Sequence, residues 1–283
     1  MTKTLMIQGT SSGAGKTTLV TALCRIFANS GYRVAPFKSQ NMSSYSYKED
    51  NFEISRAQAI QAIAARTTID PRMNPILLMP LGSYRSKVMV NGKFYKKMYA
   101  KEYYTKFALS KGLKTAKESL DWLKQNYDLV IIEGAGSPAE FNLEKYDIAN
   151  MRMAEYTHAP VILVSDIDRG GTFASIVGTI ELIDKKYRKF IQGFVINKFR
   201  GDKDILRPSL YKLRKKTGKP VLGTIPLMKF DIPEEDSLHA NPKHVQWNKK
   251  YLKSLDLEIE NLSQVVKNSL NMKAIGELLK CSL

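Results

Sequence analysis

Residues 9–18 read Gly9-Thr10-Ser11-Ser12-Gly13-Ala14-Gly15-Lys16-Thr17-Thr18. The stretch follows a short apolar run, Thr4 to Gln8, that is typical of a buried strand, and it opens a helical pattern from Lys16 to about Asn29. A glycine-rich loop between a strand and a helix lets backbone N–H groups approach phosphate oxygens at the positive end of the helix dipole. The stretch therefore predicts a nucleotide-binding loop, and a chance glycine-rich turn is the alternative.

The residue types in this loop suit ATP and Mg²⁺. Lys16 is expected to reach the β- and γ-phosphates, and the Thr17 hydroxyl to ligate Mg²⁺. The residues expected to contact ATP are Gly9, Thr10, Gly13, Ala14, Gly15, Lys16, Thr17 and Thr18. The loop alone is compatible with a kinase, a ligase or a partitioning ATPase. Thr10-Ser11-Ser12 lacks the extra lysine that is usual in partitioning ATPases of the deviant type, which argues against that class.

Apolar strand-like runs alternate with helical segments along the rest of the chain. The runs are Arg33–Phe37, Leu129–Ile132, Pro160–Ser165, Ile191–Ile196 and Pro220–Thr224, and the later helical segments span about 171–185 and 205–216. This alternation predicts an α/β fold like that of P-loop NTPases, with a mostly parallel sheet covered by helices on both faces. Ligands of such sheets bind at the carboxyl ends of the strands.

Four polar residues near strand ends are therefore candidates for chemistry. Lys38 could bridge the γ-phosphate and an acceptor carboxylate, or be an ordinary surface lysine. Glu133 could ligate Mg²⁺ or sit in a structural turn. Asn197 could contact adenine or cap a turn. Glu53 is placed at the start of a helix over Glu53–Ala65, where it could bind metal or substrate, or stabilise the helix N-terminus.

The remaining segments give a coarser prediction. Ile76–Met79 and Lys87–Val90 are expected to be short extended pieces, and Lys101–Asn126 one or two helices. An amphipathic pattern from Leu257 to Leu279 predicts a C-terminal helix. We therefore expect a P-loop ATP-binding domain over 1–238, which the resemblance described below identifies as an amide synthetase domain, and a linker with a helix over 239–283.

The formal charge of +17 is concentrated in two segments. Residues 84–118 hold ten basic and two acidic side chains, and residues 185–219 hold thirteen and two, so the rest of the chain is close to neutral. A solvated lysine-rich surface, a surface for a polyanionic small substrate and a nucleic-acid surface are the alternatives. Because no DNA- or RNA-binding signature is present, we expect no nucleic-acid partner.

Cysteine usage and hydropathy bear on location. Two cysteines, Cys24 and Cys281, cannot build a disulfide framework and indicate a reducing compartment. The N-terminus has no signal-peptide pattern, and no apolar run reaches the ~18 residues of a membrane span. We expect a cytoplasmic protein without a membrane partner; the sequence leaves open whether it forms a homo-oligomer.

Longer motifs resemble those of the cobyric acid synthase family, and the phosphate loop is similar to those of dethiobiotin synthetase and the cobyrinic acid amide synthetases. The motifs are spread from about residue 5 to 238, and they are Phe37-Lys38-Ser39-Gln40-Asn41-Met42, Glu53-Ile54-Ser55-Arg56-Ala57-Gln58-Ala59, Ile132–Glu140, Asp147–Met151, Asp166-Ile167-Asp168-Arg169-Gly170-Gly171, Phe194–Asp202 and Gly218–Gly223.

The resemblance implies an ATP-dependent amide ligase with ATP and Mg²⁺ as cofactors. The family amidates peripheral carboxylates of adenosylcobyrinic acid a,c-diamide in cobalamin synthesis, through an acyl phosphate that ammonia attacks. Lys16, Lys38 and Glu133 would then be catalytic, and Thr17, Glu133 and Glu53 would hold the metal. The substrate contacts implied are Gln40, Asn41, Arg56, Gln58, Asp168 and Arg169. A related ligase on another substrate and a partitioning or switch ATPase are the alternatives.

Three departures from the family pattern qualify this expectation. The family usually has a C-terminal glutaminase domain, and only about 45 residues follow Asp236-Ser237 here. We therefore expect the ammonia to come from a separate glutaminase or from solution. Ser39 stands where the family commonly has proline, and Met79 where it commonly has lysine.

Overall fold

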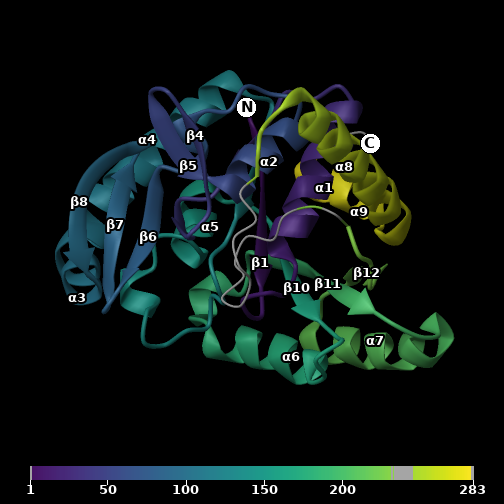
Figure 1. Cartoon of the computed structure of the whole chain (residues 1–283). Helices are drawn as coiled ribbons and strands as arrows, with labels where there is room; N and C mark the ends of the chain where they lie inside the picture. The colour runs from purple at the N-terminus through teal and green to yellow at the C-terminus, as the bar shows by residue number, and fades with distance from the viewer. Residues whose placement is uncertain (1, 231, 233–244, 282–283) are drawn as a thin grey trace.

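A six-stranded parallel sheet forms the centre of the protein in a computed structural model that describes residues 2–230, 232 and 245–281. The strand order is β12-β11-β10-β1-β9-β2 (Figure 1). The strands are β1 (Lys3–Gly9), β2 (Val34–Phe37), β9 (Leu129–Glu133), β10 (Val161–Asp166), β11 (Ile191–Phe199) and β12 (Val221–Pro226). All neighbouring strands run parallel, so their carboxyl ends meet at one edge. The predicted sheet is thus confirmed.

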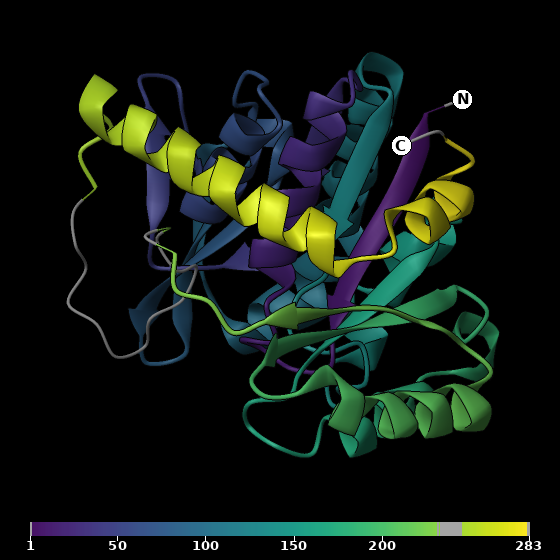
Figure 2. The same cartoon turned by 90° about the vertical axis from the view of Figure 1, so that its right-hand side faces the viewer.

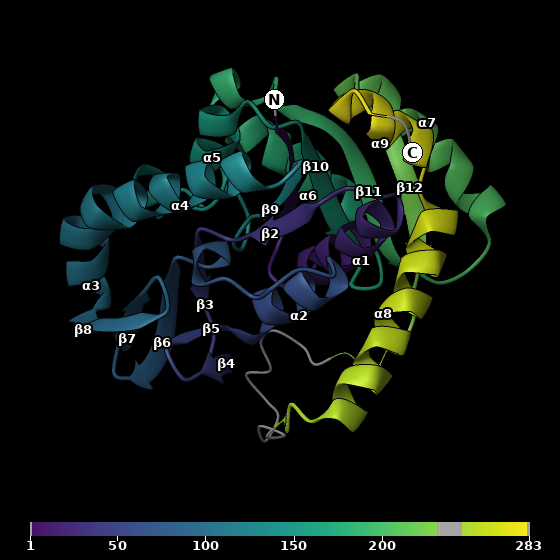
Figure 3. The same cartoon turned by 90° about the horizontal axis from the view of Figure 1, so that it is seen from above.

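Helices cover both faces of this sheet, as the sequence predicted (Figures 1 and 3). One face packs against α1 (Lys16–Asn29), α2 (Arg56–Ala64), α8 (Lys249–Ser269) and α9 (Met272–Leu279). The other packs against α4 (Leu113–Asn126), α5 (Met151–Thr157), α6 (Thr172–Leu182) and α7 (Lys203–Thr217). β9 and β10, in the interior of the sheet, are fully buried between these two apolar layers, which explains why they read as continuous apolar runs and not as alternating ones.

A second, four-stranded sheet lies beside the first, at the left of Figure 1. Its order is β3-β6-β7-β8, made of β3 (Gln40–Met42), β6 (Ile76–Gly82), β7 (Arg85–Val90) and β8 (Lys93–Tyr99). We call β6, β7 and β8 the wing. Its inner face packs on the π-helical segment η2 (Tyr103–Gly112), which continues α3 (Ala100–Glu102) and leads directly into α4. The expected extended pieces and helices of this region are therefore present, but as parts of one sheet and one continuous run.

The helix expected over Glu53–Ala65 begins three residues later. Glu53 lies in β5 (Phe52–Ser55), which forms a hairpin with β4 (Ser46–Glu49), and α2 starts at Arg56. Ser55 acts as the N-cap, because its hydroxyl accepts a hydrogen bond from the Ala57 N–H. Glu53 is therefore not a helix N-terminal stabiliser. Short 3-10 turns at Pro71–Met73 (η1), Glu144–Tyr146 (η3) and Lys185–Tyr187 (η4) complete the elements.

The C-terminal segment forms two helices where the sequence predicted one. α8 crosses α1 (Figure 2), and Leu255, Ile259 and Leu262 lie in the same apolar core as α1. The buried guanidinium of Arg25 in α1 pairs with Asp256 and Glu260 of α8. The expected boundary at 238/239 lies outside the described residues. Among those the structure describes, no helix has the length and apolar content needed to cross a membrane.

Candidate functional site

The phosphate loop lies at the carboxyl edge of the six-stranded sheet, between β1 and α1. Lys16 folds back over the loop, and its Nζ donates hydrogen bonds to the carbonyl oxygens of Ser11 (2.9 Å) and Gly136 (2.8 Å). Gly15 has a φ of 99°, and a Cβ there would lie 2.0 Å from Asn197 Nδ2. Glycine is therefore required at position 15 both for the backbone angle and for the space.

Glu133, at the end of β9, is the centre of the site. Its side chain is 0% exposed, and it accepts hydrogen bonds from Thr17 Oγ1 (2.8 Å), Lys38 Nζ (2.9 Å) and Gln61 Nε2 (2.6 Å). The structure thus brings together Thr17, Lys38 and Glu133, which the sequence selected at separate strand ends. A buried carboxylate is held here by a buried ammonium and by neutral donors, as burial of charge requires.

Thr17 and Glu133 have the donor types that suit Mg²⁺. The ion prefers hard oxygen ligands and is commonly held by one or two protein groups together with phosphate oxygens and water. The Thr17 hydroxyl and Glu133 carboxylate are in direct contact beside the phosphate loop. Among the residues the structure describes, no three His, Cys, Asp or Glu side chains form a metal cage. The residues therefore fit a nucleotide-bound Mg²⁺ and not an all-protein site.

Sequence reasoning missed Gln61, which joins Glu133 to a buried polar chain. Gln58 Nε2 donates to Gln61 Oε1 (3.3 Å), and Asn41 Nδ2 donates to Gln58 Oε1 (3.0 Å) and to Ser55 Oγ (2.7 Å). Gln58, Gln61 and Asn41 are all buried. Gln61 lies three residues after Gln58 on α2 and so shares its helix face, a signal that could have identified it. Asn41 and Gln58, which the sequence predicted as substrate contacts, are therefore members of this series of buried hydrogen bonds.

Glu53 lies in a different set of contacts from Glu133. Its carboxylate accepts a hydrogen bond from Ser46 Oγ (2.6 Å) and pairs with Lys87 Nζ of β7 (3.1 Å). Burial alone would raise the pKa of Glu53, but hydrogen bonds from Ser46 and Lys87 and the charges of Lys87 and Lys48 lower it below its ordinary value. The structure therefore places Glu53 at the wing, apart from the contacts of Thr17 and Glu133.

Residues at the ends of β10 and β11 hold the phosphate loop from its other side. Asn197 Nδ2 donates to the Ala14 carbonyl oxygen (2.9 Å), and Lys198 Nζ donates to the Gly13 carbonyl oxygen (2.9 Å) and to Asp166 Oδ2 (2.8 Å). Lys198 has a φ of 58°, uncommon for a side-chain-bearing residue. Sequence reasoning gave Asp166 and Lys198 no role, although both stand where strands end.

The other expected substrate contacts lie around this centre. Arg169 Nε is 3.7 Å from Asp166 Oδ2, and Asp168 pairs with Arg200 at the surface (2.9 Å). Gln40 Oε1 accepts a hydrogen bond from the Tyr103 hydroxyl (2.6 Å). Arg56 stacks on the Tyr45 ring at 4.2 Å, and burial lowers its pKa.

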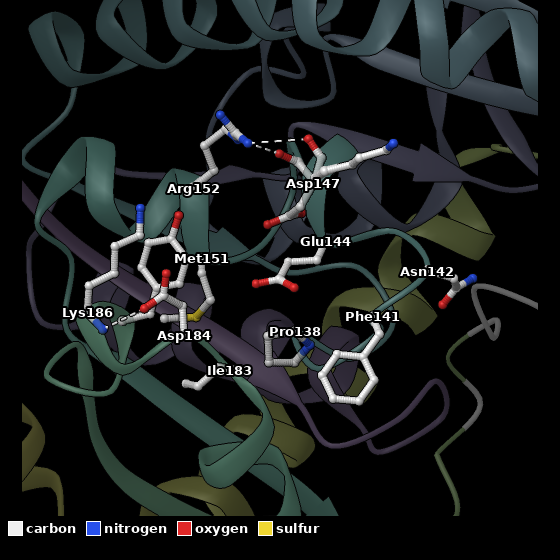
Figure 4. Close-up of a pocket in the computed structure, with 12 residues that line it drawn as sticks. Pro138, Phe141, Asn142, Glu144, Asp147, Met151, Arg152, Ile183, Asp184 and Lys186 are labelled. Carbon is white, nitrogen blue, oxygen red and sulfur yellow. Dashed lines mark hydrogen bonds between the residues drawn. The ribbon is translucent and has the colours of Figure 1, made fainter.

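Two adjoining cavities open beside the loop that follows β9. The larger, about 510 Å³, lies between residues 138–152 and 183–187, and Figure 4 shows Arg152 directed toward the Asp147 backbone. Burial raises the pKa of Asp147, which also accepts hydrogen bonds from the N–H groups of Ala149 and Asn150 (both 2.8 Å). The smaller, about 70 Å³, lies between Gln40, Tyr104 and residues 135–150. Pro138 lines both cavities. It lies two residues after Gly136, whose carbonyl oxygen accepts the hydrogen bond from Lys16, so both cavities border the loop that contacts Lys16.

Known proteins resemble this chain in sequence and in fold. Residues 5–238 match the family described as "CobQ/CobB/MinD/ParA nucleotide binding domain". A Thermococcus kodakarensis protein named "Probable cobyric acid synthase" is 53% identical over 247 residues, which is 86% of this chain and 50% of that protein. A "Cobyric acid synthase" of Caldanaerobacter subterraneus subsp. tengcongensis is 54% identical over 233 residues, covering 82% of this chain and 46% of that protein. The chain thus spans about half the length of the curated relatives it matches.

A solved structure supports the fold alone. Apo McdA of Cyanothece superposes with a TM-score of 0.51 at 15% identity, covering 99% of this chain and 100% of that one. At this identity the likeness speaks for the α/β architecture and not for an activity.

Proposed function

The chain belongs to the CobQ/CobB/MinD/ParA nucleotide-binding family, and we propose that it is the ATP-dependent synthetase part of a cobyric acid synthase. Its reaction is the amidation of peripheral carboxylates of adenosylcobyrinic acid a,c-diamide, with ATP as the energy source. The observation that supports this most is the convergence of Lys16, Thr17, Lys38 and Glu133 at one strand edge, together with the relatives' printed names.

The chemistry explains why such a site is needed. A carboxylate is a poor acyl donor, and phosphorylation of one of its oxygens turns that oxygen into a leaving group. The enzyme has to align the γ-phosphate with the carboxylate and offset negative charge on the transferring group. Lys16 and Lys38 would supply positive charge to the transferring phosphate. Mg²⁺ held by Thr17 and Glu133 would supply more. Ammonia then displaces phosphate from the acyl phosphate, so no nucleophile of the enzyme is required.

The Lys38–Glu133 pair joins two of the groups that we assign to the reaction. In the structure the Lys38 ammonium lies against the carboxylate that we assign to the metal. Thr17 and Glu133 would hold the Mg²⁺, which would supply positive charge next to the phosphates, and the Lys38 ammonium beside the same carboxylate is placed to offset charge on the phosphate and the acceptor carboxylate. Asn197 holds Ala14 of the loop in this structure, and its contact with adenine stays a proposal, as do the substrate contacts of Asp168 and Arg169.

We further propose that ammonia is the nitrogen donor and that it is released from glutamine, if at all, at a site outside these residues. Cys24 is buried in α1, and burial, with the negative charge of Glu133, raises the pKa of its thiol. A thiol of this kind is a poor nucleophile. Cys281 follows α9 and is not in a strand-to-helix turn of the kind that presents a nucleophile.

The test is mass spectrometry of the corrinoid after incubation with the protein, ATP and Mg²⁺. With ammonium we expect one or more acids to become amides, with ADP formed in step; with glutamine alone we expect no change. ATP turnover that responds to DNA or membranes, and not to corrinoid, would support a switch ATPase instead. Hydrolysis of glutamine by the purified protein would contradict the separate ammonia source.

A further inference from the structure

The smaller cavity beside the phosphate loop has a mixed polar lining. It lies between η2 and the loop after β9, and its walls include Gln40, Tyr104, Ala135, Ser137, Glu140 and Asn150. Its volume of about 70 Å³ corresponds to roughly two water molecules in the liquid. A cleft of this size admits a short side arm of a ligand and excludes a macrocyclic ring.

Two connections place this cleft next to the reacting groups. Ala135 and Ser137 flank Gly136, whose carbonyl oxygen accepts the 2.8 Å hydrogen bond from Lys16. Gln40 lies two residues after Lys38, which pairs with Glu133 at 2.9 Å. A side arm held in the cleft would therefore sit beside the position where the terminal phosphate and the acceptor carboxylate are expected to meet.

The cleft offers both hydrogen-bond donors and an acceptor. Burial and the charge of Glu140 raise the pKa of Tyr104, so its hydroxyl is a protonated donor at neutral pH. Its ring lies 5.8 Å from the ring of Tyr146, which fixes its position. The Tyr103 hydroxyl donates a hydrogen bond to Gln40 Oε1. Because this oxygen is the acceptor of the Gln40 amide, the amide N–H₂ group remains as a donor.

Glu140 determines which kind of arm this lining suits. One of its oxygens, Oε1, accepts a hydrogen bond from the Ser137 N–H (3.0 Å), and the residue lines the cleft. A carboxylate arm can only accept hydrogen bonds and would be repelled by Glu140. A primary carboxamide offers two donors and one acceptor, so it matches the acceptor Glu140 and the donors Tyr104 and Gln40 together.

We propose that this cleft binds a carboxamide side arm of the macrocyclic substrate, with Tyr104 and Glu140 as specificity-determining residues. Binding of an arm that is already amidated would place the neighbouring carboxylate arm at the phosphate loop. The inference rests on the proposed function, since it takes the macrocycle to be the substrate. It adds which residues of this chain distinguish an amidated arm from an acidic one.

The experiment measures the Kd values of cobyrinic acid a,c-diamide and of unamidated cobyrinic acid by equilibrium dialysis against the full chain, with amidation measured in parallel. Tyr104→Phe should weaken diamide binding by about fivefold, the effect of one hydrogen bond. Glu140→Gln should tighten binding of the acid by a similar factor and so reduce the preference for the diamide. The matched controls are Tyr211→Phe on α7 and Glu118→Gln on α4, both exposed, and neither should change the two Kd values.

The outcomes separate the cleft from the reaction. If the wild type amidates the diamide but both variants keep its preference between the two ligands, the cleft assignment is wrong. If the wild type binds the diamide through Tyr104 and Glu140 but forms no amide, the proposed reaction is wrong and the cleft assignment stands. If the wild type binds neither corrinoid, both are overturned.

Discussion

Glu133 and Glu53 each pair with a lysine, in two regions of different construction. Glu133 is completely buried at the end of β9, and Lys38, Thr17 and Gln61 all donate to it. Glu53 is partly buried at the edge of the wing, and it pairs with Lys87. The Lys38–Glu133 pair therefore belongs to a group of side chains that meet beside the phosphate loop, whereas the Lys87–Glu53 pair links a hairpin to a sheet.

The comparison shows how the candidate site differs from a structural ion pair. At Glu133 the charges are withdrawn from water, and the donors come from three separate segments: α1, the loop after β2 and α2. At Glu53 the partner lysine keeps 30% of its side chain exposed, so water screens the pair. The following predictions test this contrast, beginning with the largest expected effect.

Lys16→Ala should abolish ATP-dependent amidation. The variant removes the positive charge from the phosphate loop, and loss of one such group costs on the order of 100-fold or more in rate. The measurement is corrinoid amidation and ADP release under saturating ATP. Lys212→Ala on the exposed side of α7 is the matched control and should keep wild-type rates. Amidation that survives Lys16→Ala would refute the phosphate-loop assignment.

Glu133→Gln should destabilise the protein far more than Glu53→Gln. The first variant removes the negative charge facing the buried Lys38 ammonium, and breaking a buried pair costs about 3–5 kcal/mol. The second breaks a partly exposed pair, worth about 0–1 kcal/mol. Urea denaturation followed by circular dichroism gives both free energies of unfolding. Equal losses in the two variants would show that burial does not separate the two regions.

Gln61→Leu tests the residue that the sequence did not reveal. The change keeps a similar volume but removes the donor to Glu133 Oε2, and a hydrogen bond to a charged group contributes about 1.5–3 kcal/mol. We expect lower stability, with a higher Mg²⁺ concentration needed for half-maximal turnover because the carboxylate is less firmly oriented. Gln264→Leu on the exposed side of α8 is the control. An unchanged Mg²⁺ requirement would reduce Gln61 to a packing residue.

Reversing the exposed charges of the wing should have the smallest effect. Lys93→Glu with Lys97→Glu places negative charge on β8, where both lysines are exposed. If the wing attracts a polycarboxylate, the KM for corrinoid should rise by up to about fivefold at low salt, equivalent to about 1 kcal/mol, and the difference should shrink as salt is added. Lys212→Glu with Lys216→Glu on α7 carries the same charge change. If the β8 and α7 double variants raise the KM for corrinoid equally, the effect comes from the net charge of the protein and not from the wing.

The sequence predicted the local parts of the fold and site well. The phosphate loop and the strands around it were found because backbone geometry and burial impose short-range patterns on glycines and apolar residues. Lys38 and Glu133 were found because each follows such a strand. The same reasoning placed Glu53 on a helix, and it did not separate α8 from α9, because neither boundary is marked by a strong local signal.

By itself, the sequence determined that this chain binds phosphate through a strand–loop–helix unit within an α/β sheet. Only the tertiary structure decided which distant side chains meet. Gln61 reaches Glu133 across 72 residues, Arg25 reaches α8 across more than 230, and the cleft at Tyr104 needs η2 to lie against the loop after β9. Local patterns follow from the conformational preferences of neighbouring residues. Contacts between distant segments depend on how whole elements pack, and no short stretch of sequence contains that information.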